Sequence, residues 1–303
     1  QRTRFVRAIG PHFQHRLFLT ATPHNGYTES FTSLLELLDD QRFARNILPD
    51  ERRLSQVMIR RLKSDLVDAQ GNPLYASRTL QALEVPYTAE EREIHRKLDD
   101  YCVSREKDAG KAGNGFSTAF VNRLLKKRLL SSPAAFASTI EKHVVSLSEA
   151  RPARPDTMAD RILYKAILKA DEDYADDWEV ENAQAEAVEE ATRRASPLTA
   201  EQRGMLDELR AWAQRARNQA DSKAKAILDW IDEHLRPGGK WNGARVILFT
   251  EYRATHGWLF QILTNHGCGG ERLAELHGSL DPEDRAKVTA AFQAAPDVSP
   301  VRI

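Results

Sequence analysis

The chain has 303 residues, of which 41% are apolar and 29% charged, a composition typical of globular domains and long enough for two of them. No apolar run approaches the ~20 residues that cross a bilayer, and the start of the chain lacks the apolar stretch of a secretory signal. The 44 basic and 44 acidic residues cancel, which argues against a uniformly basic nucleic-acid module. The two cysteines, Cys102 and Cys268, are too far apart in sequence to suggest a zinc site or a disulfide framework. We therefore expect a cytoplasmic protein.

The charges are unevenly distributed even though their sum is zero. Residues 171–190 contain ten acidic residues and no basic one. Basic clusters occur at 60–63 and 123–128, so a local positive surface is compatible with a neutral total. The acidic stretch is expected to be a polar connector.

The N-terminal part predicts a strand, a loop and a helix. His15–Thr20 reads as a short buried strand, and the following Pro23 and Asn25-Gly26 mark a loop. Phe31, Leu34, Leu35 and Leu38 then follow the spacing of one apolar helix face. Residues 54–67 look helical, and residues 78–87 look like a strand.

From Thr88 to Leu235 the pattern is mostly helical. Thr88 and Glu91 have the spacing of a capping box, with Thr88 as the cap. Ser222 is expected to cap a later helix, which Pro237-Gly238-Gly239 ends.

The C-terminal part predicts alternating strands and helices. Residues 245–250, 273–276 and the start of a third strand at 301–303 are separated by two helices, the second of which begins at Pro282. This alternation is typical of a parallel sheet with right-handed crossovers. The prediction is an α/β fold.

Several segments resemble motifs of SNF2-family helicases. Leu17–Pro23, with its Thr-Ala-Thr-Pro, resembles the third helicase motif, and Val57–Asp65 resembles an Arg-Arg-x-Lys signature of that family. Leu129–Ala135 matches a helical segment of the bacterial branch. Ile247–Tyr252 resembles motif IV, and Leu276–Leu280 fits the next strand of that domain. The five segments occur in the order and at roughly the spacing of the family.

The resemblance implies parts of two RecA-like parallel-sheet domains joined by a mainly helical SNF2-type insertion. Residues 1–76 would end the first domain and begin its helical extension, 77–220 would form the insertion, and 221–303 would begin the second domain. The whole protein would be an ATP-dependent double-stranded-DNA translocase that uses ATP and Mg²⁺. Its bacterial relatives would include helicases of the RNA-polymerase-recycling type and of DISARM-type phage defence, with a protein partner in a transcription or defence complex.

The sequence departs from the family where ATP chemistry is concerned. It contains neither Gly-x-x-x-x-Gly-Lys-[Ser/Thr] nor Asp-Glu-x-His, although phosphoryl transfer needs a phosphate cradle and a metal. In the family's order both would precede Gln1. We expect no catalytic residue, no metal ligand and no bound nucleotide within this chain, and hence no ATP hydrolysis by it alone.

The resemblance also suggests which residues couple ATP to DNA. Thr20, Ala21 and Thr22 would form the coupling loop of motif III, although two hydroxyls at a strand end can equally satisfy the backbone of a turn. Candidates for contact with nucleic acid are Arg60, Arg61, Lys63, Arg123, Lys127, Thr250 and His277. Arg123 and Lys127 share a helix face, but such basic clusters are also common on solvated surfaces.

A second hypothesis requires no motor. The chain could be a non-catalytic interaction module that binds a partner through its helical part, with the acidic residues 171–190 as the docking surface. A P-loop encoded upstream of Gln1 would favour the motor, and its absence would favour the module.

Overall fold

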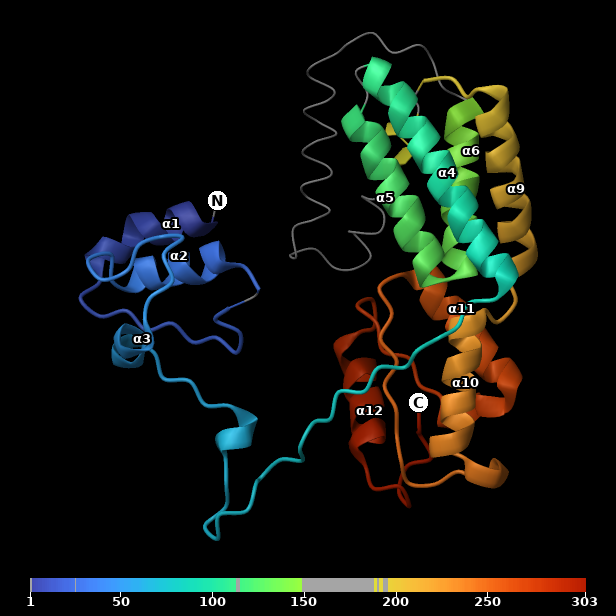
Figure 1. Cartoon of the computed structure of the whole chain (residues 1–303). Coiled ribbons are helices and arrows are strands. Elements are labelled where there is room, and N and C mark those ends of the chain that lie inside the picture. Colours follow the sequence, from blue (N-terminus) through green and yellow to red (C-terminus); the bar gives the residue numbers. More distant parts are fainter. Residues whose placement is uncertain (1, 25, 113–114, 149–187, 190, 193–195) are drawn as a thin grey trace. The chain divides into compact units, whose positions relative to one another are not determined.

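The computed structural model describes residues 2–24, 26–112, 115–148, 188–189, 191–192 and 196–303, and Figure 1 shows them as helices joined by extended segments. In these ranges a single isolated bridge, between Val67 and Pro73, is the only β pairing assigned. The predicted α/β class with two RecA-like parallel sheets is therefore wrong for the described chain. Residue contacts divide the chain into two compact units, Gln1–Gln81 and Ala82–Ile303.

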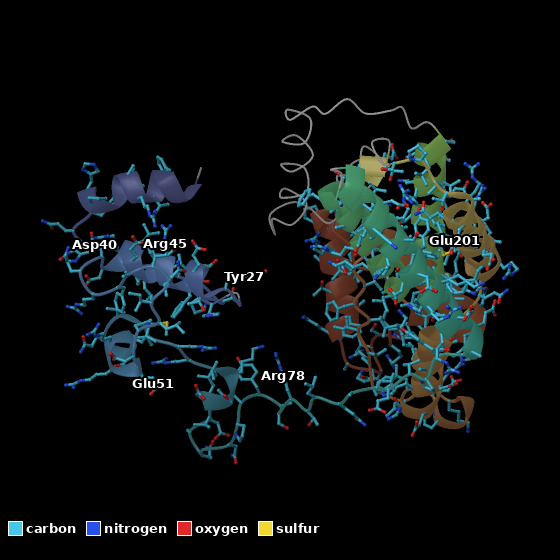
Figure 2. The ribbon with its side chains drawn as sticks, turned by 45° about the horizontal axis from the view of Figure 1, so that its top comes forward. Tyr27, Asp40, Arg45, Glu51, Arg78 and Glu201 are labelled. Atoms are coloured by element: carbon cyan, nitrogen blue, oxygen red, sulfur yellow. The ribbon has the colours of Figure 1, made fainter. Side chains whose placement is uncertain are left out.

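The first unit has three α-helices, α1 (Arg2–Ile9), α2 (Thr28–Leu38) and α3 (Glu51–Val57), with short 3-10 turns at Gly10–His12 and Lys63–Asp65. Its core is small because few apolar side chains converge: Phe31, Leu35 and Phe43 are buried, with Leu54, Val57 and Met58 packed against them. Glu36 of α2 binds two arginines, Arg7 at 2.8 Å and Arg45 at 3.5 Å (Figure 2 labels Arg45).

The strands expected in this unit do not form. Leu17 and Leu19, predicted to be buried, are 81% and 87% exposed. Residues 78–87 are extended but unpaired within the described chain, and Leu80 is fully exposed. The helix expected over 54–67 ends at Val57. A strand bonds only to another strand, so β-favouring side chains form none where no described segment offers a partner.

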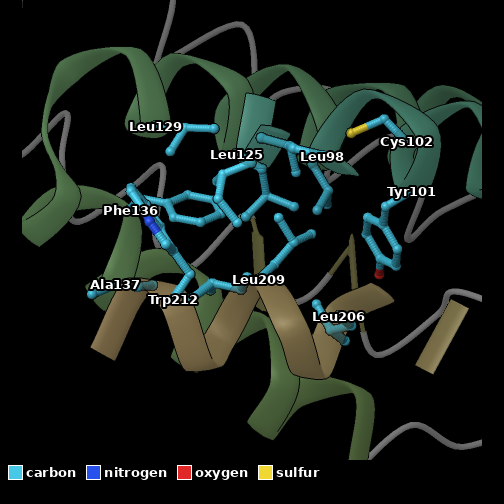
Figure 3. Packing of buried hydrophobic residues seen from close by; sticks show 14 of the residues in the cluster. Leu98, Tyr101, Cys102, Leu125, Leu129, Phe136, Ala137, Leu206, Leu209 and Trp212 are labelled. Carbon is cyan, nitrogen blue, oxygen red and sulfur yellow. The ribbon is translucent and has the colours of Figure 1, made fainter. Parts of the chain in front are cut away.

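The second unit begins with a helical bundle of α4 (Ala89–Ala112), α5 (Gly115–Ser131), α6 (Pro133–Ser148) and α9 (Ala200–Ala216). Figure 3 shows the interior, where side chains from all four helices interlock. Fully buried members include Leu98, Tyr101, Leu125, Phe136 and Leu209. A bundle of this kind is stable because each helix satisfies its own backbone and needs only an apolar face against its neighbours.

The capping box predicted at the start of α4 is confirmed. The Thr88 hydroxyl accepts from the Glu91 amide at 3.1 Å, and the Glu91 carboxylate accepts from the Thr88 amide at 2.7 Å. Thr199 and Gln202 form the same arrangement at the start of α9, at 3.2 and 3.1 Å. Each box satisfies two amides that the first turn of a helix leaves unbonded.

Three helices follow the bundle: α10 (Ser222–His234), α11 (Arg253–Leu263) and α12 (Pro282–Gln293). Short turns occupy Pro237–Gly239, Thr264–Cys268 and Gly270–Arg272. These helices were predicted, and α12 begins at Pro282 as expected. Asp221, one residue before the predicted Ser222, is the cap of α10, accepting from the Ala224 amide at 2.7 Å.

Ser222 instead links α10 to the bundle. Its amide donates to the Glu91 carboxylate at 2.8 Å, and its hydroxyl also donates to Glu91. Burial tends to raise the pKa of Glu91, but the hydrogen bonds from Ser222 and Thr88 outweigh it and lower the pKa to about 2. Glu91 is therefore a charged anchor between two parts of the second unit.

The predicted C-terminal strands are also absent. Residues 245–250, 273–276 and 301–303 are extended, yet none is a β-strand, and Phe249 is 90% exposed. Isolated backbone bonds join them: Val246 N donates to Arg302 O, and Ala274 N donates to Ile303 O, both at 2.9 Å.

Candidate nucleic-acid interface

The basic residues at 123–128 of α5 point in different directions because of the helical repeat. Their side chains therefore have three kinds of surroundings. Lys126 pairs with Asp99 of α4 at 2.7 Å, and the hydrogen bond to Asp99 raises the pKa of Lys126. Arg128 is buried, with its guanidinium 3.7 Å from the centroid of the Tyr252 ring. Arg123 and Lys127 are exposed and have no carboxylate partner among the described residues. Of the run, these two remain available to bind phosphate.

The end of α5 is fixed against the start of α11. The hydroxyls of Ser131 and Ser132 lie 2.6 and 2.8 Å from the Thr255 hydroxyl. The ammonium of Lys223 donates to the Ser131 carbonyl at 2.8 Å. Burial lowers the pKa of Lys223. Because several buried polar contacts hold this junction, Lys127 lies on a rigid part of the second unit.

An open groove of about 550 Å³ lies between α6, the end of α9 and α11. Its lining includes the cations Lys142, Arg217 and Arg253. The one carboxylate in the lining, Glu141, is bound by Arg210 through two hydrogen bonds of 2.8 and 2.6 Å. The lining therefore carries more cationic than anionic side chains, which suits an anionic ligand.

No sequence pattern predicted this groove. Lys142 belongs to α6, Arg217 follows the last residue of α9, and Arg253 begins α11, so no local pattern links them. Helical periodicity identifies each as outward-facing, but the groove depends on how the helices pack.

Thr250 and His277 are each close to His256 or its neighbours. Thr250 lines a cavity together with His256 and Glu275. The His256 ring stands edge-on to the His277 ring, with centroids 5.9 Å apart, and its Nδ1 lies 3.5 Å from a Glu275 oxygen. His277 is exposed, and its Nδ1 lies 2.9 Å from the Ser279 hydroxyl, so it has a turn contact as well as access to solvent.

The remaining candidates belong to the first unit. Arg60 and Arg61 are exposed on an extended segment, and neither has an ion-pair partner among the described residues. The Lys63 ammonium lies 5.2 Å from the centroid of the Tyr75 ring. In the loop that resembles motif III, the Thr20 hydroxyl accepts from the Thr22 amide at 3.1 Å, so it satisfies a backbone group of the turn.

No group of three or more metal-binding side chains occurs in the described part of the chain, and the sequence has no P-loop. The buried His143 lies among hydroxyl groups of the bundle. It contacts the Tyr101 hydroxyl at 2.8 Å and the Thr192 hydroxyl at 3.0 Å, and burial lowers its pKa to about 3. Burial raises the pKa of the Cys102 thiol to about 12, which makes it a poor nucleophile.

Comparisons of this chain with protein-family models, with curated proteins and with solved structures found no match. Within the described ranges, no helix combines the length and the apolar character required to cross a bilayer.

Proposed function

We propose that this chain is part of an ATP-dependent double-stranded-DNA translocase of the SNF2 type and that it contributes contacts to the DNA backbone. The SNF2-like segments, which follow one another in the order typical of that family, support this class of translocase. The structural observation that carries the DNA contact is the pair Arg123 and Lys127, exposed one turn apart on a rigid helix without an acidic partner among the described residues. Two guanidinium or ammonium groups so spaced suit successive phosphates.

The proposal assigns ATP hydrolysis to residues outside this chain. The sequence has no P-loop to bind phosphate. The resemblance placed the coupling loop at the end of a strand in a parallel sheet, and the described residues form no such sheet. Thr20 and Thr22 are therefore proposed as coupling residues on sequence alone. ATP and Mg²⁺ would serve the whole protein, in the cytoplasm, where a reducing environment suits the two buried free thiols Cys102 and Cys268. A partner in a transcription or phage-defence complex belongs to the same proposal.

DNA binding is tested by fluorescence anisotropy of a labelled duplex over a salt series. We expect affinity to fall steeply between about 50 and 200 mM salt and to show little dependence on sequence. The double variant Arg123→Ala/Lys127→Ala should bind several-fold more weakly. Its slope of log affinity against log salt should be smaller by about 1.8, the value for two lost phosphate contacts.

Lys126→Ala is the matched control, because it removes a neighbouring cation that is already paired with Asp99. It should lower the log of the DNA affinity by less than half as much as the double variant does. A loss of half that size is what one charge in place of two would give and would mean that only the total charge matters, and DNA binding that is unaffected by all three substitutions would refute this interface.

The alternative of a non-catalytic interaction module is favoured by one observation: the described chain is a well-packed helical bundle without a sheet. The docking surface suggested for it, residues 171–190, lies outside the described residues apart from Val188 and Glu189. Failure of the folded chain to bind any duplex at low salt would favour the module over the translocase.

A further inference from the structure

The groove between α6, the end of α9 and α11 has walls that are joined by polar contacts. Glu141 of α6 accepts two hydrogen bonds from Arg210 of α9, at 2.8 and 2.6 Å. The indole N–H of Trp258 on α11 donates at 3.2 Å to the carbonyl of Gln219, which follows α9. Because these contacts cross from one wall to another, the groove is preformed, as small-molecule sites usually are.

Cationic side chains come from all three walls of this groove. Lys142 of α6, Arg217 at the end of α9 and Arg253 of α11 belong to the lining, and Glu141 is the one acidic residue of the described lining. Lys142 is exposed, and the guanidinium of Arg217 donates to the neutral side chain of Gln214 at 3.3 Å. A concave surface with this excess of cations suits a compact dianion such as a phosphate monoester, whose geometry the guanidinium fork matches.

The other polar residues of the lining suit hydroxyl groups. Gln214, Asn218 and Gln261 are exposed carboxamides, and each has both donors and an acceptor to offer, as hydroxyl groups do. Trp258, the aromatic residue of the described lining, is only 7% exposed. A nucleobase would therefore find no exposed ring on which to stack. A sugar or polyol suits these residues better than a nucleotide does.

The groove has room for such a ligand because several lining residues are small, among them Ala134, Ala254 and Gly257. Its volume of about 550 Å³ is typical of small-molecule sites. We propose that this groove binds a small phosphorylated sugar or polyol, with Lys142 and Arg217 holding the phosphate and the carboxamides holding the hydroxyl groups. The proposal does not depend on DNA binding by α5.

Isothermal titration calorimetry of the whole chain with glucose 6-phosphate at low salt tests the ligand class. Glucose and inorganic phosphate are titrated separately. We expect glucose 6-phosphate to bind at least ~10-fold more tightly than either, since tenfold is less than one charge-assisted hydrogen bond contributes. The titration is repeated in an excess of duplex DNA, which should leave the affinity for glucose 6-phosphate unchanged.

Three variants locate the site. Lys142→Ala/Arg217→Ala should weaken glucose 6-phosphate binding at least ~10-fold. Lys225→Ala/Lys240→Ala removes the same charge from exposed positions outside the lining and should leave binding unchanged. Gly257→Leu keeps every charge but fills the groove. A Cβ at this position meets nothing within 4 Å, and leucine favours a helix more than glycine does, so the chain should remain folded by circular dichroism while binding is lost.

Each contrary result overturns a stated part of the proposal. No binding of glucose 6-phosphate by the folded parent chain, equal losses in the two double variants, or unchanged binding by Gly257→Leu would overturn the site itself. Inorganic phosphate that binds as tightly as glucose 6-phosphate would overturn the sugar or polyol as part of the ligand. Displacement of glucose 6-phosphate by duplex DNA would assign the groove to the nucleic-acid interface instead.

Discussion

The helical bundle and the C-terminal extended segments contain similarly apolar sequences, but their apolar side chains differ in burial. In the bundle, Leu125 and Phe136 are completely buried, whereas in the extended segments Phe249 is 90% exposed. A helix forms its backbone bonds within one stretch of chain, so only its side chains need neighbours. An extended segment needs partners for backbone and side chains alike. The extended segments therefore cover their apolar residues unevenly: Ile303 is buried in the C-terminal core and Val246 and Leu248 pack against it, whereas Phe249 lies in solvent.

The largest expected effect is on the free energy of unfolding, which should respond very differently to the loss of one phenylalanine from each region. Phe136→Ala removes a fully buried ring from the bundle core and should lower the free energy of unfolding by about 3–5 kcal/mol. Phe249→Ala removes a ring that is already in solvent and should change it by less than about 0.5 kcal/mol. Urea unfolding followed by far-UV circular dichroism measures both.

Similar losses for the two variants would mean that Phe249 is covered in solution. That result would contradict the comparison between the regions.

Helix positions were predictable from sequence because their signals are local. The Thr88–Glu91 capping box, the stop at Pro237-Gly238-Gly239 and the start at Pro282 all depend on residues within one or two turns. Gly238 adopts φ of 63°, a left-handed value that glycine tolerates and that ends a helix readily.

The sheet was not predictable because strand formation depends on a distant partner. Residues 17–20 and 245–250 have β-favouring compositions, but composition does not show whether another segment pairs with them. The same limit applies to the candidate interface. Sequence spacing correctly placed Arg123 and Lys127 on one face, yet it could not reveal that Arg128 turns inward to Tyr252 or that three helices form a cationic groove.

An intermediate effect concerns acid stability of the bundle. His143 has a pKa of about 3 in the folded chain because it is buried, against an ordinary value of 6.5. Above pH 6.5 the imidazole is neutral in both states and contributes no pH dependence. Between about pH 6.5 and 3 the unfolded chain binds the proton and the folded chain does not, so stability should fall by up to about 1.4 kcal/mol per pH unit.

His143→Gln should remove that slope while keeping polar contacts to Tyr101 and Thr192. Burial also lowers the pKa of His95, so part of the dependence should remain in the variant. Protonation of Glu91 adds to the loss of stability only below about pH 4.5. There its stabilising charge begins to be lost as the pH falls toward 2. Identical slopes for the variant and the parent between pH 6.5 and 4.5 would show that His143 is not buried as a neutral group.

The smallest expected effect compares two threonine hydroxyls that bind backbone amides in different settings. Thr199→Ala removes the cap of α9, whose hydroxyl accepts from the Gln202 amide at 3.2 Å, and should cost about 1 kcal/mol. Thr20→Ala removes a hydroxyl that accepts from the exposed Thr22 amide at 3.1 Å. Water can replace that contact, so its loss should change the free energy of unfolding by less than about 0.5 kcal/mol. Urea titration of both variants measures the difference. A Thr20 cost as large as that of Thr199 would indicate that the loop of residues 20–22 is packed in solution.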